Sequence, residues 1–203
     1  MITGIVQTAV CAFDGAEFMK RETCPFCGGP VQGYDTREKK FAVLLEEDRE
    51  RTITVRVRRF TCRSCKRLCN ADEPFYPDTR IGSPIIDLYT TLSATMPHSR
   101  AARVIDAMGI RIDRTSWRNY QDRAMPEIPA TEMFGMRLPR SVLSLSTLAA
   151  RIPEGGCIMG AEALAACGFP SAYRATQDLF LPAQERDDRN YEEEKEERQA
   201  DPP

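Results

Sequence analysis

Two short turns of the chain each carry a pair of cysteines that are separated by two residues. The first pair is Cys24 and Cys27, the second is Cys62 and Cys65, and 34 residues lie between the two turns. Thiolate sulfurs are the ligands that a tetrahedral zinc ion prefers, and each turn supplies two of the four that it needs. Because four cysteines leave no coordination position open for water, the spacing predicts a structural zinc site rather than a catalytic one.

A further cysteine leaves an alternative for the fourth ligand, because only three residues separate Cys69 from Cys65. We favour Cys65, since its spacing from Cys62 mirrors the first pair. A redox-active pair is another interpretation of each turn, but such pairs usually stand alone between a strand and a helix. The isolated cysteines are expected to be small core residues: Cys11, Cys157 and Cys167.

Residues suited to catalysis are scarce in the sequence. The only histidine, His98, follows Pro97 at the start of a predicted helix, where we expect a capping or surface role. A single histidine also disfavours histidine-based acid–base chemistry. Residues 124–183 contain no strand-borne pair of aspartates that would hold a catalytic metal. Their carboxylates are Glu127, Glu132, Glu154, Glu162 and Asp178. We therefore expect no enzymatic activity.

The residues between the two cysteine turns predict a β-hairpin that brings the turns together. Its strands are residues 39–45 and 51–62, joined by the charged turn 46–50. In the second strand, apolar residues alternate with polar or basic ones, as in a strand with one buried face. The apolar set is Ile53, Val55 and Val57, and the opposite set is Thr54, Arg56 and Arg58. We therefore expect a hairpin with one basic face.

Charge is distributed unevenly along the chain. The net charge is −2 overall, but residues 1–150 carry +4 and residues 151–203 carry −6. From Arg49 to Arg67 there are eight basic residues and one acidic residue, Glu50. Such a local excess of positive charge suits contact with the phosphate backbone of a nucleic acid. The candidate contacts in this region are Arg56, Arg58, Arg59, Arg63, Lys66 and Arg67.

Helical periodicity replaces strand periodicity after the connector at residues 70–77. The predicted helices begin at Ser83, at Pro97 or Ser99, and at Arg114 after its cap Asp113. Gly109 is expected to end the second helix in a left-handed conformation, and the third helix reaches about residue 123. Two shorter helical pieces are expected within residues 142–148 and 155–181.

The second and third of these helices, with the turn between them, match a helix-turn-helix, which places its second helix in the major groove of DNA. Ile112 and Trp117 are expected to point inward and hold the angle between the helices. Arginine pairs with guanine or phosphate, asparagine with adenine and threonine with either. The candidate DNA contacts are Arg111, Arg114, Thr115, Arg118 and Asn119. An ordinary helical bundle with solvated charges is the alternative.

Residues 20–123 resemble the N-terminal region of insertion-sequence transposases and related archaeal transposase-like proteins. These proteins join a zinc ribbon that ends in an aromatic-x-Cys-x-x-Cys turn to a helix-turn-helix. Residues 60–65, Phe-Thr-Cys-Arg-Ser-Cys, match that turn, and residues 112–120 look like the second helix of the latter. The turn between the helices is longer than in the tightest such motifs, and no region after residue 123 resembles the three-carboxylate nuclease domain. The resemblance therefore implies DNA binding and does not imply strand transfer.

The predicted fold class is α+β, with a small zinc ribbon followed by a helical helix-turn-helix bundle and a disordered acidic tail. The acidic tail is almost wholly charged and cannot bury enough apolar area to offset chain entropy. The expected divisions are an N-terminal arm at residues 1–19, the ribbon at 20–77, the helical domain at 78–150, an Ala/Gly-rich segment at 151–183 and the tail at 184–203.

Together these features predict a DNA-binding protein with a structural zinc ion, either a transposase-like DNA-binding region or a transcription regulator without its own nuclease domain. Double-stranded DNA is the expected partner, a homodimer is left open, and no membrane or small-molecule partner is expected. Since we find no secretory leader and no apolar stretch of spanning length, the expected location is the cytoplasm, at the nucleoid. The alternative function is a zinc-ribbon adaptor that binds proteins of the transcription or translation machinery.

Overall fold

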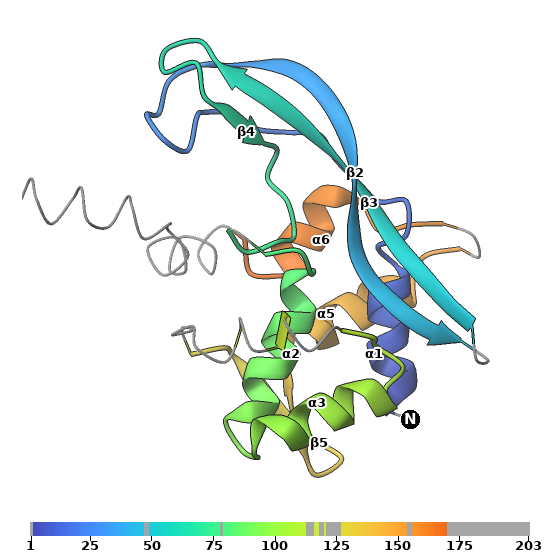
Figure 1. The fold of residues 1–203 in the computed structure, drawn as a ribbon. Helices are drawn as coiled ribbons and strands as arrows, with labels where there is room; N and C mark the ends of the chain where they lie inside the picture. The colour runs from blue at the N-terminus through green and yellow to red at the C-terminus, as the bar shows by residue number, and fades with distance from the viewer. Residues whose placement is uncertain are drawn as a thin grey trace, which may run out of the picture.

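The computed structural model describes residues 2–46, 49–77, 79–112, 116–117, 120, 127–153 and 156–169 of the chain. These residues form a mixed α+β fold with five helices and two sheets, which confirms the predicted class (Figure 1). The acidic segment 184–203, predicted to be disordered, lies outside the described residues.

A long antiparallel hairpin forms most of the larger sheet. Its strands are β2 (Val31–Glu46) and β3 (Arg49–Cys62), so the predicted hairpin is confirmed, with a first strand longer than expected. Two short strands that the sequence did not predict also pair with β3. They are β1 (Glu17–Phe18), which runs parallel to it, and β4 (Leu68–Asn70), which runs antiparallel.

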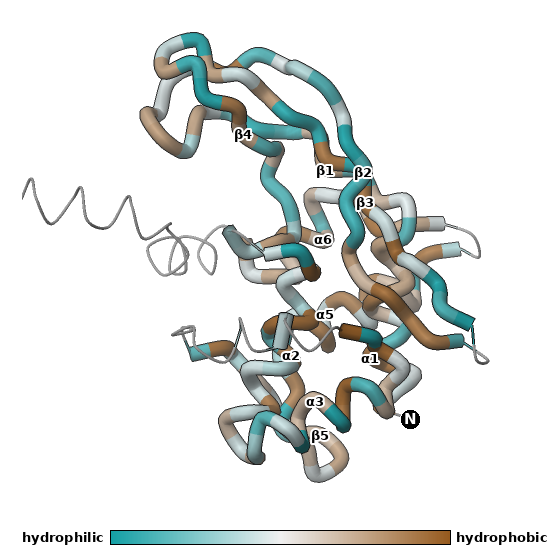
Figure 2. Tube along the Cα trace, in the orientation of Figure 1, coloured by the Kyte–Doolittle hydropathy of each residue, from teal (hydrophilic) through white to brown (hydrophobic). Residues whose placement is uncertain are grey.

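The hairpin packs against the helices along its middle, where Phe41, Leu44 and Val55 are buried, and its open end projects from the molecule (Figure 1). The register of β2 against β3 shifts between Gly33 and Thr36 and again between Lys40 and Ala42. Such irregularities bend a strand and increase its twist, which accounts for the curvature of the hairpin. Figure 2 shows hydrophobic segments where the hairpin crosses the helices and more hydrophilic ones along its projecting end.

The predicted alternation in β3 is confirmed where the strand crosses the helices. One face is buried, and the opposite face is exposed or half-buried. The buried set is Ile53, Val55 and Val57, and the outer set is Thr54, Arg56 and Arg58.

Helices pack against the middle of the hairpin, and a small second sheet packs against two of these helices (Figure 1). The helices are α1 (Ile2–Cys11), α2 (Ser83–Ser93), α3 (His98–Ala107), α5 (Arg140–Ala149) and α6 (Gly160–Ala166). The second sheet pairs β5 (Ala130–Met133) with β6 (Met136–Pro139), and the sequence did not predict it. No helix in the described part of the chain is both long and apolar enough to cross a membrane.

One hydrophobic core joins the base of the hairpin to the helices. The ring of Phe41 in β2 stacks on Phe13 with centroids 4.1 Å apart and meets Phe75 edge-on at 5.9 Å. Gly82 packs on the same ring, since a Cβ there would lie 2.2 Å from Cε2 of Phe41. A glycine is therefore required where the chain enters α2.

The N-terminal residues form a helix that is part of this core, whereas we expected an N-terminal arm. Val6, Ala9 and Val10 of α1 are buried, and the helix packs against α5. Their spacing places them on one face of the helix. Because α1 has only ten residues, this apolar pattern is too short to distinguish a helix from a strand in the sequence.

The predicted helices over residues 83–109 are confirmed with one change at a cap. Ser83 is fully buried inside the first turn of α2, and Gly82 takes the N-cap position that we had expected Ser83 to hold. The helix α3 follows Pro97 and buries Ala101 and Ile105. Gly109 then adopts a φ of +79°, as expected for the end of this helix.

Only three residues of the predicted third helix are described, and all three are helical: Ser116, Trp117 and Tyr120. Trp117 is buried against α2, where its ring centroid lies 4.2 Å from that of Tyr89. This confirms the inward direction predicted for Trp117. The hydroxyl of Tyr89 also lies 3.0 Å from Nδ1 of His98, so the only histidine joins the start of α3 to α2.

Candidate metal centre

The four predicted ligands meet at the projecting end of the hairpin. The sulfurs of Cys24, Cys27, Cys62 and Cys65 all lie within 4.8 Å of one another. Sγ of Cys24 is 3.7 Å from that of Cys65, and Sγ of Cys27 is 3.5 Å from that of Cys62. A tetrahedral ion with Zn–S bonds of about 2.3 Å has sulfur–sulfur edges of about 3.8 Å, whereas bonded disulfide sulfurs are about 2.05 Å apart. The spacing therefore fits four thiolates around one zinc ion.

The predicted ribbon covered residues 20–77. From here on the name is used only for the part that surrounds the cluster, residues 20–40 and 56–70. Its two cysteine turns have the same backbone hydrogen bonds. In the first turn, the N–H of Gly28 donates to the carbonyl of Cys24, and the N–H of Cys24 donates to the carbonyl of Gly29, both at 2.9 Å. The second turn repeats both bonds with Lys66, Cys62 and Arg67 in the corresponding places. Each turn is thereby held in the shape that presents two sulfurs.

The residue after the second cysteine of each turn adopts a left-handed conformation. Gly28 has a φ of +69°, and Lys66, at the corresponding position, has a φ of +62°. Glycine adopts this conformation freely, whereas a residue with a Cβ pays about 1–2 kcal/mol for it. Because Lys66 adopts it as well, the geometry of the turn itself requires it.

Hydrogen bonding favours the thiolate form of Cys62 in this cluster, against the opposing effect of burial. Cys24 and Cys62 are buried, while Cys27 and Cys65 are exposed. The backbone N–H of Cys65 points at Sγ of Cys62 across 3.5 Å and is the main reason that the pKa of Cys62 is lowered to about 6. Four thiolates at this spacing repel one another, and a divalent cation offsets that repulsion. Binding of the metal would supply folding free energy to a ribbon with a small core of its own.

Cys65 rather than Cys69 belongs to the cluster. Cys69 lies in β4 opposite Phe60 and is part of the hydrophobic core, where burial raises its pKa. Of the three isolated cysteines, Cys167 is buried as predicted and Cys11 is partly buried. Cys157 is exposed, so the prediction of a core position is wrong for this residue.

Two of the predicted nucleic-acid contacts on the hairpin are engaged in ion pairs. Arg56 pairs with Glu17 of β1. Arg59 holds both carboxylate oxygens of Asp35, with Nε 2.6 Å from Oδ1. The bond from Arg59 also keeps the pKa of Asp35 below its ordinary value, so both groups stay charged. The charge of Arg59 is therefore offset locally by Asp35.

The other predicted contacts on the ribbon keep their positive charge exposed. No carboxylate of the described residues lies within ion-pair distance of Arg58, Arg63 or Lys66, and all three side chains are exposed. Arg67 is exposed too, and its guanidinium lies over the ring of Phe26, 5.1 Å from the centroid. The ribbon as a whole has 11 basic and 3 acidic residues.

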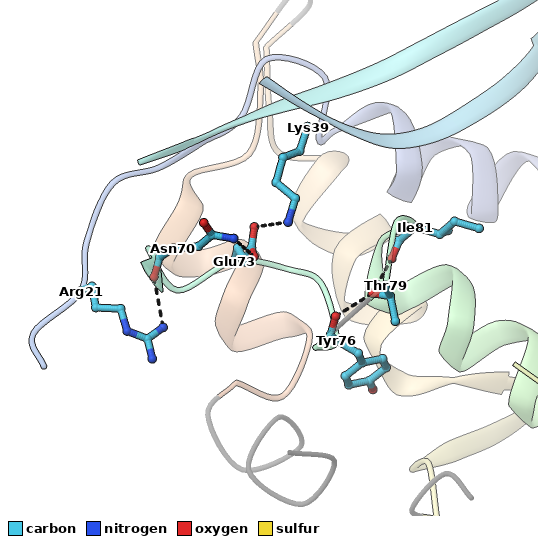
Figure 3. Close-up of polar contacts among 7 residues, drawn as sticks. All are labelled: Arg21, Lys39, Asn70, Glu73, Tyr76, Thr79 and Ile81. Atoms are coloured by element: carbon cyan, nitrogen blue, oxygen red, sulfur yellow. Dashed lines mark hydrogen bonds and ion pairs between the residues drawn. The ribbon is translucent and has the colours of Figure 1, made fainter. Parts of the chain in front are cut away.

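The connector at residues 70–77, which leads toward α2, is held against the ribbon by hydrogen bonds (Figure 3). Oε2 of Glu73 accepts a bond from Nζ of Lys39 in β2, and Oε1 accepts one from Nδ2 of Asn70, both at 2.7 Å. Arg21 donates to the backbone carbonyl of Asn70 at 3.3 Å from the other side. These bonds tie the connector to the chain on both sides of the first cysteine turn, so the ribbon has a defined direction.

The turn after α3 bonds to the edge of β2. The N–H of Arg111 donates to the carbonyl of Val43 at 2.9 Å. The side chain of Arg111, a predicted DNA contact, is exposed and forms an ion pair of 2.7 Å with Asp106. The remaining predicted contacts of this region lie outside the described residues: Arg114, Thr115, Arg118 and Asn119.

Two exposed aromatic residues of the ribbon were not among the contacts predicted from the sequence. Phe26 stands between the cysteines of the first turn, and Tyr34 lies at the first register shift of β2. Both side chains are exposed, at 52% and 65% respectively. The available signal was the presence of large aromatic residues in a segment otherwise rich in polar and basic ones.

Comparison with protein-family models, with curated proteins and with solved structures finds no match for this chain.

Proposed function

We propose that this chain binds double-stranded DNA, with a structural zinc ion in the ribbon, as a transposase-like DNA-binding region or a transcription regulator. The observation that carries the proposal is the continuity of β2, which runs from the cysteine turns to the turn at Gly109–Arg111. A strand of 16 residues spans up to about 50 Å, more than one turn of B-DNA at about 35 Å. The basic side chains of the ribbon and Arg111 are thus within reach of one duplex.

The charge of the ribbon supports the same proposal. Exposed arginine and lysine side chains without carboxylate partners attract phosphates and release the counterions that surround DNA. Arg58 and Arg63 are of this kind, and they lie on opposite sides of Cys62 along the chain. The ion pair of Arg111 with Asp106 is exposed, and such pairs contribute little, so a phosphate can replace the carboxylate.

Fluorescence anisotropy with a labelled blunt duplex, repeated over a series of salt concentrations, tests the proposal. The wild type is expected to bind with an affinity that falls steeply as salt rises. Arg58→Ala and Arg63→Ala should each weaken binding for all sequences and reduce the salt slope by about 1. Arg151→Ala removes the same charge from an exposed position beyond α5 and is the matched control.

The same assay applied to Arg114→Ala and Arg118→Ala tests the predicted recognition helix, because these changes should also reduce discrimination between DNA sequences. Binding that does not respond to salt, or ribbon variants that behave like Arg151→Ala, would contradict the proposal.

A further inference from the structure

Exposed apolar side chains are concentrated on the ribbon. Five large hydrophobic residues are exposed in the described part of the chain, and three of them belong to the ribbon. They are Phe26, Tyr34 and Leu68, while the other two are Phe134 and Met159. Single exposed apolar residues are common on proteins. Their concentration on the most basic part of this chain requires a more specific account.

Each of the two aromatic rings on the ribbon has an arginine over it. The guanidinium of Arg67 lies 5.1 Å from the ring centroid of Phe26, and that of Arg59 lies 5.4 Å from the ring centroid of Tyr34. These contacts orient the rings. More than half of each aromatic residue nevertheless remains exposed, so surface is left for a second stacking partner.

The charge around Tyr34 is arranged so that a phosphate is not repelled. Asp35, the neighbouring acid, has both carboxylate oxygens bound by Arg59. Beyond this pair, Arg58 and Lys66 add exposed positive charge, and neither has a carboxylate partner among the described residues. Aromatic rings are thus set among cations with the nearest acid neutralised.

This combination selects one class of ligand. Aromatic side chains in a positively charged surface stack on nucleic-acid bases, and the phosphates follow the basic residues. Inside a duplex both faces of a base are covered by its neighbours, so a base must be unpaired or unstacked before it can stack on a protein ring. We propose that Phe26 and Tyr34 bind the bases of single-stranded nucleic acid. This inference rests on the proposed function in that the ribbon contacts nucleic acid, and it adds unpaired strands to the ligands.

The test measures anisotropy with a labelled single strand and, in parallel, with a blunt duplex. The wild type is expected to bind the single strand. Phe26→Leu and Tyr34→Leu should each weaken that binding about tenfold, in line with the usual contribution of one stacked base, and leave the blunt duplex unaffected. Phe134→Leu, at an equally exposed ring in the β5–β6 turn, is the matched control and should change neither affinity. Thermal unfolding and bound zinc, measured on each variant, verify that the ribbon is intact.

A second variant reports stacking directly. The only tryptophan of the chain, Trp117, is buried, so Tyr34→Trp introduces the one exposed indole. Its fluorescence should be quenched by the single strand and not by the blunt duplex. Single-strand binding that survives both leucine substitutions, or no single-strand binding at all, overturns the inference. A wild type that binds the single strand but not the duplex overturns the proposed function and leaves the inference standing. A wild type that binds neither probe overturns both, and this is the result expected of a ribbon that binds a protein partner.

Discussion

The backbone N–H of Leu45 donates a hydrogen bond of 2.7 Å to the carbonyl of Gly109 and so joins the end of β2 to the turn after α3. An antiparallel bridge between Leu44 and Ile110 lies beside it. On the other side of the turn, Nε2 of Gln7 in α1 donates to the carbonyl of Met108 at 3.1 Å. The hairpin that carries the ribbon and the helices are therefore linked by backbone hydrogen bonds as well as by the shared core.

Replacement of Gly109 by alanine should disrupt this junction. Gly109 has a φ of +79°, and a Cβ there would lie 2.6 Å from Nε2 of Gln7 and 3.1 Å from the carbonyl oxygen of Leu45. We expect a loss of 2 kcal/mol or more in the free energy of unfolding, on the order of the left-handed penalty plus crowding. Chemical denaturation monitored by circular dichroism measures it.

Gly135→Ala is the control for that prediction. Gly135 has a φ of +73°, but a Cβ there would meet no atom within 4 Å. Only the backbone penalty of about 1 kcal/mol applies. Equal losses for the two variants would show that Gly109 is not packed against β2 and α1 in the way described.

The cysteine turns give a second prediction, because their equivalent residues differ in type. Gly28→Ala should destabilise the metal-bound ribbon by about 1 kcal/mol through its backbone alone, since no atom lies near the added Cβ. Lys66→Gly should relieve strain of similar size at the matching position. Thermal unfolding of the zinc-bound protein compares the two variants. A shift in the same direction for both would contradict the equivalence of the turns.

A buried carboxylate sets the expected response to pH. Asp87 of α2 accepts a hydrogen bond of 2.5 Å from the hydroxyl of Tyr76 and one of 2.7 Å from that of Ser141 in α5. Burial nevertheless raises the pKa of Asp87 from 3.8 to about 6. Because the folded-state pKa lies above the unfolded one, the folded protein holds this proton more tightly. The resulting stability is fully present below about pH 4 and is lost as the pH rises through 6.

The variant Asp87→Asn should remove that pH dependence. A pKa shift of this size corresponds to a loss on the order of 3 kcal/mol between acidic and neutral pH, which the wild type should show and the variant should not. Denaturation at several pH values measures the difference. Asp106→Asn, at an exposed acid paired with Arg111, is the control and should keep the wild-type slope. Parallel curves for the wild type and Asp87→Asn would refute the assignment.

Much of the candidate site was predictable because local chemistry determines it. The paired cysteine spacings indicated four ligands, and the alternation of Ile53, Val55 and Val57 indicated the buried face of β3. Helix starts at proline and the stop at Gly109 were also predictable, since each depends on backbone preferences of single residues.

The features that the sequence did not predict depend on contacts between distant residues. The helix α1 is stabilised by packing on α5 rather than by a long periodic pattern of its own. The strands β1 and β4 have two and three residues and exist because the edge of β3 that faces away from β2 is free to pair with them. The pairing of Arg59 with Asp35 requires the register shift after Gly33, which no local pattern indicates.

Native mass spectrometry after dialysis into zinc-free buffer is the sharpest check that the four clustered cysteines bind one structural zinc ion. One zinc ion per chain is expected in the wild type, in Cys69→Ala and in the exposed control Cys157→Ser, and none in Cys65→Ser. A metal-free wild-type chain that is as stable to heat as the zinc-bound one would contradict a structural zinc site. So would zinc that is retained in Cys65→Ser and lost in Cys69→Ala.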